Sequence, residues 1–535
     1  MNAQRRETPD TVDSGQPRPT RQHWLALAVL AVGLGLIVLD GTIVGVALPA
    51  IIVDLGLTLT EAQWVNSLYA VILAALLLPT GKIADSFGRK RTFIAGMIVF
   101  GIGSALAAVA TTAALLIGAR AVQAVGAALI MPSTLSTVNA VFRGKYRAAA
   151  FGVWGAVISG AAAIGPLAGG MLTQWASWHW IFIVNIPLIA GLLVAAWLLV
   201  PETKGVKTRR GVDVDGGLLA AIGFGSLAFA VVEGPHRGWI TASDGSGTLS
   251  IIPIVFGVAL IALTLFVLWE RHRDKVERDA LLDLGLFRFR TFSWGNITAA
   301  MVAIGEFAII FVLPLYLVNV LGLSVLTTGL VLSGMAIGAF CSGAAARHLA
   351  ARLGAVGTAL LGLVIELVGV VALVVTVTPT TPAAVITLPL VLYGLGLGLA
   401  SAQLTGTVLQ DVPAEVSGQA SATQSTVRQI GAALGTALAG ASLSTALHIT
   451  LPPALAAAGV TGSAASELAR ATRDSAGTNL PQVNDAAIHS VLTDGFSAAT
   501  QWSLLFAGVF LLVGVIGAWQ LKRATAVSQR DTIRS

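Results

Sequence analysis

Five ionisable residues stand inside long apolar stretches of this chain, where a charge is costly to place. They are Asp40, Arg120, Glu306, Glu366 and Arg428. A charged side chain at the centre of a bilayer costs about 2.5–3.5 kcal/mol on insertion scales, so a residue of this kind usually serves binding or transport. The pattern predicts proton exchange or charge-dependent ligand binding as the chemistry of this protein.

Asp40 is the strongest candidate because the sequence around it is almost wholly apolar. Apolar surroundings favour the neutral form of a carboxyl group, which lets it take up and release a proton in a cycle. Arg120 keeps its charge and needs an acceptor, so we expect it to hold Asp40 ionised until a proton or a cation displaces it. The alternatives are an aspartate that only fixes helix packing and an arginine that is a static polar clamp.

The second half of the chain carries the other candidates. Glu306 lies in the middle of its apolar stretch and is expected to bind a cationic group or a second proton, with a structural role as the alternative. Glu366 and Glu233 are weaker candidates of the same kind. Arg428 is expected to be paired and to serve substrate binding or gating. The slight excess of acids over arginines inside the apolar stretches favours a cationic guest.

The polar run 81–91 lies between two apolar stretches. An ordinary cytoplasmic loop needs cations, whereas this run also has bracketing glycines and one acid. We expect a polar turn that acts as a cytoplasmic gate, in which Asp85 accepts from backbone N–H groups at a helix start near Ser417 and Gly418. The gate residues are Gly81, Asp85, Gly88, Arg89 and Arg91.

The run 160–170 combines glycines with a proline. Pro166 lacks an N–H group and clashes with the preceding turn, so it should bend a helix. The glycines remove side chains and allow a second helix to approach closely. The residues of this motif are Gly160, Gly165, Pro166, Gly169 and Gly170.

The composition places these motifs in a membrane. Of the 535 residues, 56% are hydrophobic and 11% are charged, against roughly 25% charged residues in soluble domains. Stretches of about 20 apolar residues predict fourteen transmembrane helices. Their ranges are 24–46, 63–83, 93–110, 113–138, 148–172, 180–200, 216–234, 250–269, 292–320, 325–346, 356–376, 383–407, 416–446 and 501–521.

The cations predict the orientation of these helices. With both termini in the cytoplasm, 27 of the 32 Lys and Arg residues fall in cytoplasmic segments and three in outer loops, as the positive-inside rule requires. The predicted parts are a cytoplasmic tail (1–23), a six-helix bundle (24–200), a connector (201–215), two inserted helices (216–270), a cytoplasmic loop (271–291), a second six-helix bundle (292–521) with an outer loop (447–500), and a tail (522–535). We expect a multi-pass protein of a bacterial inner membrane.

Several classes of protein are excluded by what the sequence lacks. The single cysteine, Cys341, rules out disulfides and thiolate clusters. Because the cations lie in short loops between apolar helices, nucleic-acid binding is not expected. No phosphate-binding Gly-x4-Gly-Lys-Ser/Thr motif, zinc motif or nucleophile elbow occurs, so ATP, metal cofactors and hydrolase chemistry are not expected. A sensor would need a soluble signalling domain, and the outer loop is too small for one.

The ordered set of motifs resembles the major facilitator superfamily and, within it, the fourteen-helix drug–proton antiporter family. The run 81–91 is similar to the signature loop between helices 2 and 3. The family's motifs of helices 1, 4 and 5 are similar to the runs 39–49, 120–126 and 160–170. Two further similar runs, 178–187 and 428–431, follow in the same order along the chain as in the family. One departure is Gly45, where the family commonly has asparagine, so a polar side chain available for substrate contact is absent.

The resemblance implies a secondary exporter in which two bundles rock about a midplane site. A proton would be the coupling ion, driving a small lipophilic and often cationic compound outward, and the glycine-rich helix 5 would block proton leak. The family's arginine at the position of Arg120 is tied to proton transfer. The alternative is an exporter dedicated to one natural product, siderophore or lipid. Neither reading predicts an enzyme, and the sequence names no partner protein.

Overall fold

The computed structural model describes residues 19–534 except 143, 204–212, 243–247, 277, 279, 413–416 and 461. A few side chains within helices, including that of Asp85, are outside this description. The described part is almost entirely helical, with one isolated bridge between Thr241 and Leu249. The predicted all-helical membrane class is confirmed.

The helices are long because no water is available in a bilayer to pair with free backbone groups, so each crossing segment must satisfy its own N–H and C=O groups. In chain order they are α1 (Arg21–Leu55), α2 (Leu59–Phe87), α3 (Arg89–Ala108), α4 (Ala113–Val141), α5 (Gly144–Trp175), α6 (Trp180–Ile183), α7 (Asn185–Leu199), α8 (Val214–Arg237), α9 (Ile252–Lys275), η1 (Leu284–Arg288), α10 (Arg290–Asn319), α11 (Val325–Thr376), α12 (Ala383–Val408), α13 (Ser417–Ala457), α14 (Ser463–Asp474), η3 (Leu480–Gln482) and α15 (Ala486–Arg534).

Among the described residues, eleven helices are long and apolar enough to cross a membrane. The helices α2 and α5 have 29 and 32 residues. The helix α11 consists of two arms, because Gly354 adopts φ 74° and ψ 163°, a conformation that interrupts the helix. Residues 334–343 of the first arm and 362–369 of the second both pack along α12 in opposite directions. The count of fourteen crossings stays a prediction.

One predicted helix, 180–200, is divided. The helix α6 ends at Ile183 and α7 begins at Asn185. Pro187 explains the break, since its ring has no N–H group and clashes with the carbonyl four residues earlier, at Ile183. The break places the side chain of Asn185 at the start of α7, where it is fully buried.

The predicted outer loop 447–500 is mostly helical. The helix α13 continues to Ala457, and α15 begins at Ala486, so both extend beyond the predicted apolar ranges. The sequence prediction was limited to apolar residues, whereas helices outside a membrane need only one buried side. Between them lies α14, with Ala465 and Ala469 buried.

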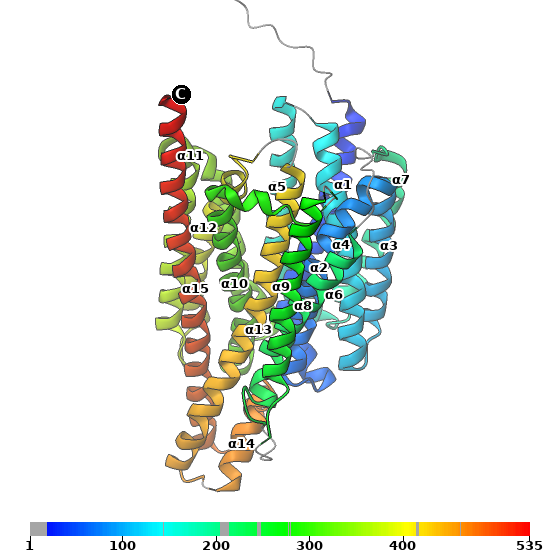
Figure 1. The fold of residues 1–535 in the computed structure, drawn as a ribbon. Coiled ribbons are helices and arrows are strands. Elements are labelled where there is room, and N and C mark those ends of the chain that lie inside the picture. The colour runs from blue at the N-terminus through cyan, green and yellow to red at the C-terminus, as the bar shows by residue number, and fades with distance from the viewer. Residues whose placement is uncertain are drawn as a thin grey trace, which may run out of the picture.

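The helices form two halves with α8 and α9 beside them. Figure 1 shows this green pair between the blue and cyan helices of the first half and the orange and red helices of the second. The helix α8 packs against α2 of the first half and α13 of the second. The helix α1 begins at the end of the molecule where α15 finishes, and α14 lies at the opposite end (Figure 1). The predicted division into two bundles and an inserted pair stays a prediction.

Candidate functional site

Asp40 and Arg120 form an ion pair inside the first half. The guanidinium of Arg120, on α4, contacts Oδ2 of Asp40, on α1, and both side chains are fully buried. Arg120 also donates from Nη1 to Oε1 of Gln123 at 2.8 Å. The pairing that the sequence predicted is therefore present in the structure.

Side-chain amides from α4 and α7 donate to the carboxylate of Asp40. Its Oδ1 accepts from the side-chain amides of Gln123 and Asn185, each at 3.1 Å. Both amides also donate to the hydroxyl of Ser104 on α3, at 2.9 and 3.3 Å. These polar residues were not selected from the sequence. Gln123 lies three positions after Arg120, hence on the same helix face, and this spacing was an available signal.

Tyr69 and Val65 of α2 cover the other side of Arg120. The guanidinium lies 4.2 Å from the ring centroid of Tyr69, and Nε donates to the carbonyl of Val65 at 3.4 Å. The ion pair is thus enclosed by protein from α1, α2, α3, α4 and α7. A buried pair with satisfied hydrogen bonds is stable only while both charges are present, because loss of one leaves the other unpaired. Protonation of Asp40 would therefore change the whole network.

Glu306 and Arg428 form a looser pair in the second half. Arg428 Nη2 lies 3.5 Å from Oε2 of Glu306, an ion-pair distance at which no hydrogen bond forms. The Arg428 side chain is 44% exposed and that of Glu306 17%. Unlike the first pair, this one is partly open, so an incoming molecule has access to it.

The two weaker acid candidates have different surroundings. Glu366 is fully buried on the second arm of α11, against Gly396 of α12, and neither carboxylate oxygen has a hydrogen-bond partner in the described part. Glu233 accepts from Trp64 Nε1 at 3.0 Å and from Arg237 Nε at 2.7 Å. It therefore attaches the C-terminal end of α8 to α2, which is a structural role.

The predicted polar turn is much shorter in the structure. Helices α2 and α3 are separated by Gly88 alone, which adopts φ 115° and ψ 132°. The run 81–91 is therefore helical on both sides of a single hinge residue, and the expected turn was wrong. The cause is that helix propensity favours Lys and Arg, so a polar run need not be a loop.

Acceptors outside the motif hold its cations. Arg89 Nη1 donates to the carbonyl of Ser136 on α4 at 3.0 Å. Arg91 Nε lies 3.7 Å from Oε2 of Glu202, and Oε1 of the same residue accepts from the Lys90 backbone N–H at 3.2 Å. Glu202 was not selected from the sequence. The proposed contact of Asp85 with Ser417 and Gly418 falls outside the described side chains and stays a prediction.

The glycines of α5 allow close contact with α1 and α11. A Cβ atom at Gly169 would lie 2.9 Å from Ile43, and one at Gly170 would lie 2.9 Å from the carbonyl of Val325. Gly165 faces Thr42 with even less space. The expectation was wrong for Gly160, where an added Cβ atom would have no atom of the described part within 4 Å. Helix α5 is continuous through Pro166, and the expected bend stays a prediction.

The departure at Gly45 also has a structural explanation. A Cβ atom there would lie 2.9 Å from Ile310 Cγ2, across the contact between α1 and α10. This α1–α10 contact joins the two halves, as do two others. They are the α5–α11 contact and the hydrogen bond from Gln63 Nε2 to the carbonyl of Ala437 at 2.9 Å. We call these three contacts the outer contact, because their residues lie toward the end of the molecule that carries α14. An asparagine at position 45 would not fit there.

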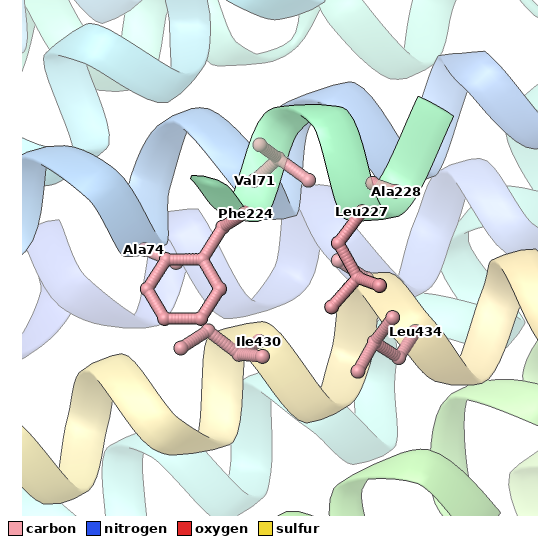
Figure 2. A pocket seen from close by; sticks show the side chains of 8 residues that line it. Val71, Ala74, Phe224, Leu227, Ala228, Ile430 and Leu434 are labelled. Carbon is pink, nitrogen blue, oxygen red and sulfur yellow. The ribbon is translucent and has the colours of Figure 1, made fainter. Parts of the chain in front are cut away.

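An apolar pocket lies where α2, α8 and α13 meet. Its volume is about 220 Å³, including space open to the surroundings, and all of its lining side chains are apolar. Figure 2 shows Phe224 and Leu227 of α8 directed toward Ile430 and Leu434 of α13. The pocket offers contact to an apolar molecule but no hydrogen bond from a side chain.

Three features of the structure agree with a sequence comparison. They are the helix bundles, the buried acid–arginine pair and the glycine contacts between the halves. A model of the major facilitator superfamily matches residues 30–436. The chain belongs to the major facilitator superfamily. It is therefore a multi-pass membrane transporter.

Several members of the superfamily are similar to this chain. The multidrug efflux pump LfrA of Mycolicibacterium smegmatis is 33% identical over 434 residues, which cover 80% of this chain and 83% of that protein. The puromycin resistance protein pur8 of Streptomyces alboniger is 34% identical over 429 residues, covering 78% and 82%. A bacterial homologue of the human lysosomal transporter Spinster, solved inward-facing and unoccupied, shares the fold with a TM-score of 0.62 at 19% identity, covering 95% and 98%.

Proposed function

We propose that this transporter exports lipophilic compounds, cationic ones among them, in exchange for protons. The carrying observation is the enclosed Asp40–Arg120 pair. A buried ion pair is often no more stabilising than apolar side chains of the same volume, so its presence calls for a function. A carboxylate whose protonation disrupts a whole hydrogen-bond network suits a step that couples proton binding to a change of conformation.

In this proposal the two bundles, 24–200 and 292–521, alternate between inward-open and outward-open arrangements, with 216–270 inserted between them. Asp40 is the proton site, Arg120 its counterion, and Glu306 meets a cationic part of the substrate. The gate residues act on the cytoplasmic side of a cell membrane, with both termini cytoplasmic. Relatives named as a multidrug efflux pump and as a multidrug resistance protein support the export of several compounds. No reaction is catalysed, and the proton is the coupling ion.

A second candidate is export of one natural product. Relatives named for resistance to a single antibiotic, such as puromycin or tetracenomycin C, favour it. A resistance panel in a host that lacks its own pumps separates the two, because a dedicated exporter protects against one chemical family only.

The variant Asp40→Asn tests the proton site. It preserves the size of the side chain but cannot ionise. In inverted vesicles we expect it to lose accumulation of a lipophilic cationic dye driven by a proton gradient, while dye–dye exchange without a gradient persists and reports that the protein is folded. Accumulation equal to that of the unmodified protein would remove Asp40 from this role.

A further inference from the structure

A second crevice lies between α10, α12 and α13. Its volume is about 250 Å³, including space open to the surroundings. Three of its lining residues are apolar, and the polar ones are Ser401, Thr405, Gln424 and Arg428. No carboxylate of the described part is among its lining residues. The crevice therefore combines an apolar wall with hydrogen-bond donors and one positive charge.

Arg428 has unused donors at this crevice. A guanidinium carries five N–H groups in a fixed plane and accepts nothing. Its partner in the described part is Glu306, at a distance of 3.5 Å that is too long for a hydrogen bond, and Arg428 donates no hydrogen bond within that part. With 44% of its side chain exposed, it can receive an acceptor without losing Glu306.

The neighbouring polar groups are also available. The amide of Gln424 is buried, and its only hydrogen bond in the described part is a long one of 3.4 Å to Thr405 Oγ1. The hydroxyl of Ser401 has no partner in the same part and is half-buried. These groups lie on α12 and α13, so one ligand oxygen group can contact both helices.

We propose that this crevice binds a carboxylate of the exported compound on Arg428. The planar fork of an arginine matches the two oxygens of a carboxylate and forms two parallel hydrogen bonds. Ala299, Val302 and Leu404 then contact an adjoining apolar body. Glu306 remains beside Arg428 and favours a ligand that also carries a positive charge. This inference rests on the proposed export function and adds amphipathic zwitterions to the cationic compounds among its substrates.

Two dyes that differ in one group provide the test. Rhodamine 110 carries a free carboxylate, and rhodamine 123 is its methyl ester, with the same aromatic body. Binding to the purified full-length protein is measured by fluorescence polarisation. We expect Arg428→Gln to raise the Kd of rhodamine 110 by about tenfold or more, the range of a charge-assisted hydrogen bond, and that of rhodamine 123 by less than about twofold.

Three further variants sharpen the result. Arg428→Lys keeps the charge but loses the planar fork, so it should weaken rhodamine 110 by an intermediate factor. Ser401→Ala should have a smaller effect in the same direction. Arg523→Gln is the matched control, because Arg523 stacks on Trp519 of α15 with 3.5 Å between guanidinium and ring centroid, and does not line the crevice. It should bind both dyes normally.

Equal weakening of both dyes overturns the carboxylate site, as does unchanged binding of rhodamine 110 or its failure to bind to the unmodified protein. Normal binding of rhodamine 123 by Arg428→Gln shows that the variant is folded. The proposed export function fails by a different result, the absence of gradient-driven dye movement in vesicles. Binding in detergent needs no gradient, so the two failures are distinguishable.

Discussion

A single added carbon at Gly45 should weaken the outer contact. A Cβ atom there would lie 2.9 Å from Ile310 Cγ2, well inside ordinary van der Waals contact. Forcing an extra carbon into a packed contact costs about 1–3 kcal/mol. Because α1 and α10 belong to opposite halves, this cost applies only while the halves touch on this side. The ratio of outer-closed to outer-open molecules should therefore fall about 5- to 150-fold.

Double electron–electron resonance can measure this change. Spin labels attached to cysteines at positions 112 and 380 report the separation of the two halves, since Thr112 and Thr380 are exposed in loops on opposite halves. The background carries Cys341→Ser, because Cys341 is the sole native cysteine. We expect Gly45→Ala to populate longer distances. Adding Ile310→Ala should restore the original distribution, because it removes the atom that clashes.

Gly118→Ala on α4 is the matched control, since no atom of the described residues lies within 4 Å of a Cβ atom at that position. An unchanged distance distribution in Gly45→Ala would refute the reasoning. So would a shift that Ile310→Ala does not reverse. A lower melting temperature with no shift would mean that the contact stabilises the fold rather than one conformation.

Three further outcomes are expected. Glu306→Gln should reduce efflux of cationic dyes more than of neutral ones in whole cells, and equal loss of both would indicate proton coupling in place of charge recognition. Gly169→Ala should increase passive proton leak in liposomes, because its Cβ atom would clash with α1. Gly160→Ala is the control and should not increase the leak. Equal leak in both variants would contradict the contact assigned to α5. Glu202→Gln removes the charged partner of Arg91, so transport should slow. The melting temperature should change little, because a surface ion pair contributes about 0–1 kcal/mol to stability. A large loss of stability would show that Glu202 mainly supports the fold.

The sequence predicted the membrane class and the main charged residues for a simple physical reason. The length of an apolar stretch and the few charges within it are properties of the local sequence, so they do not depend on the tertiary structure. The pairing of Asp40 with Arg120 followed because a buried arginine needs an acceptor. The polar motif at 81–91 was recognised as special, but its backbone was misassigned, since charged residues tolerate both helices and turns.

Other residues could not be selected without the fold. Gln123, Asn185 and Ser104 are ordinary polar residues in their own helices. Only the convergence of α1, α3, α4 and α7 lets both amides donate to the carboxylate of Asp40 and to the hydroxyl of Ser104. Glu202 follows α7 and meets the cations of α3 only in space. The contrast between Gly160 and Gly169 likewise depends on which helix passes nearby.

The sequence by itself determined that this protein lies in a membrane, that it carries acids and arginines at costly depths, and that it resembles proton-driven exporters. The tertiary structure decided which charges are enclosed and which are accessible. Asp40 is surrounded by donors, whereas Arg428 retains free ones beside a crevice. Hydropathy is a sum over neighbours in the chain, but hydrogen-bond satisfaction depends on neighbours in space, so the second could not be read from the first.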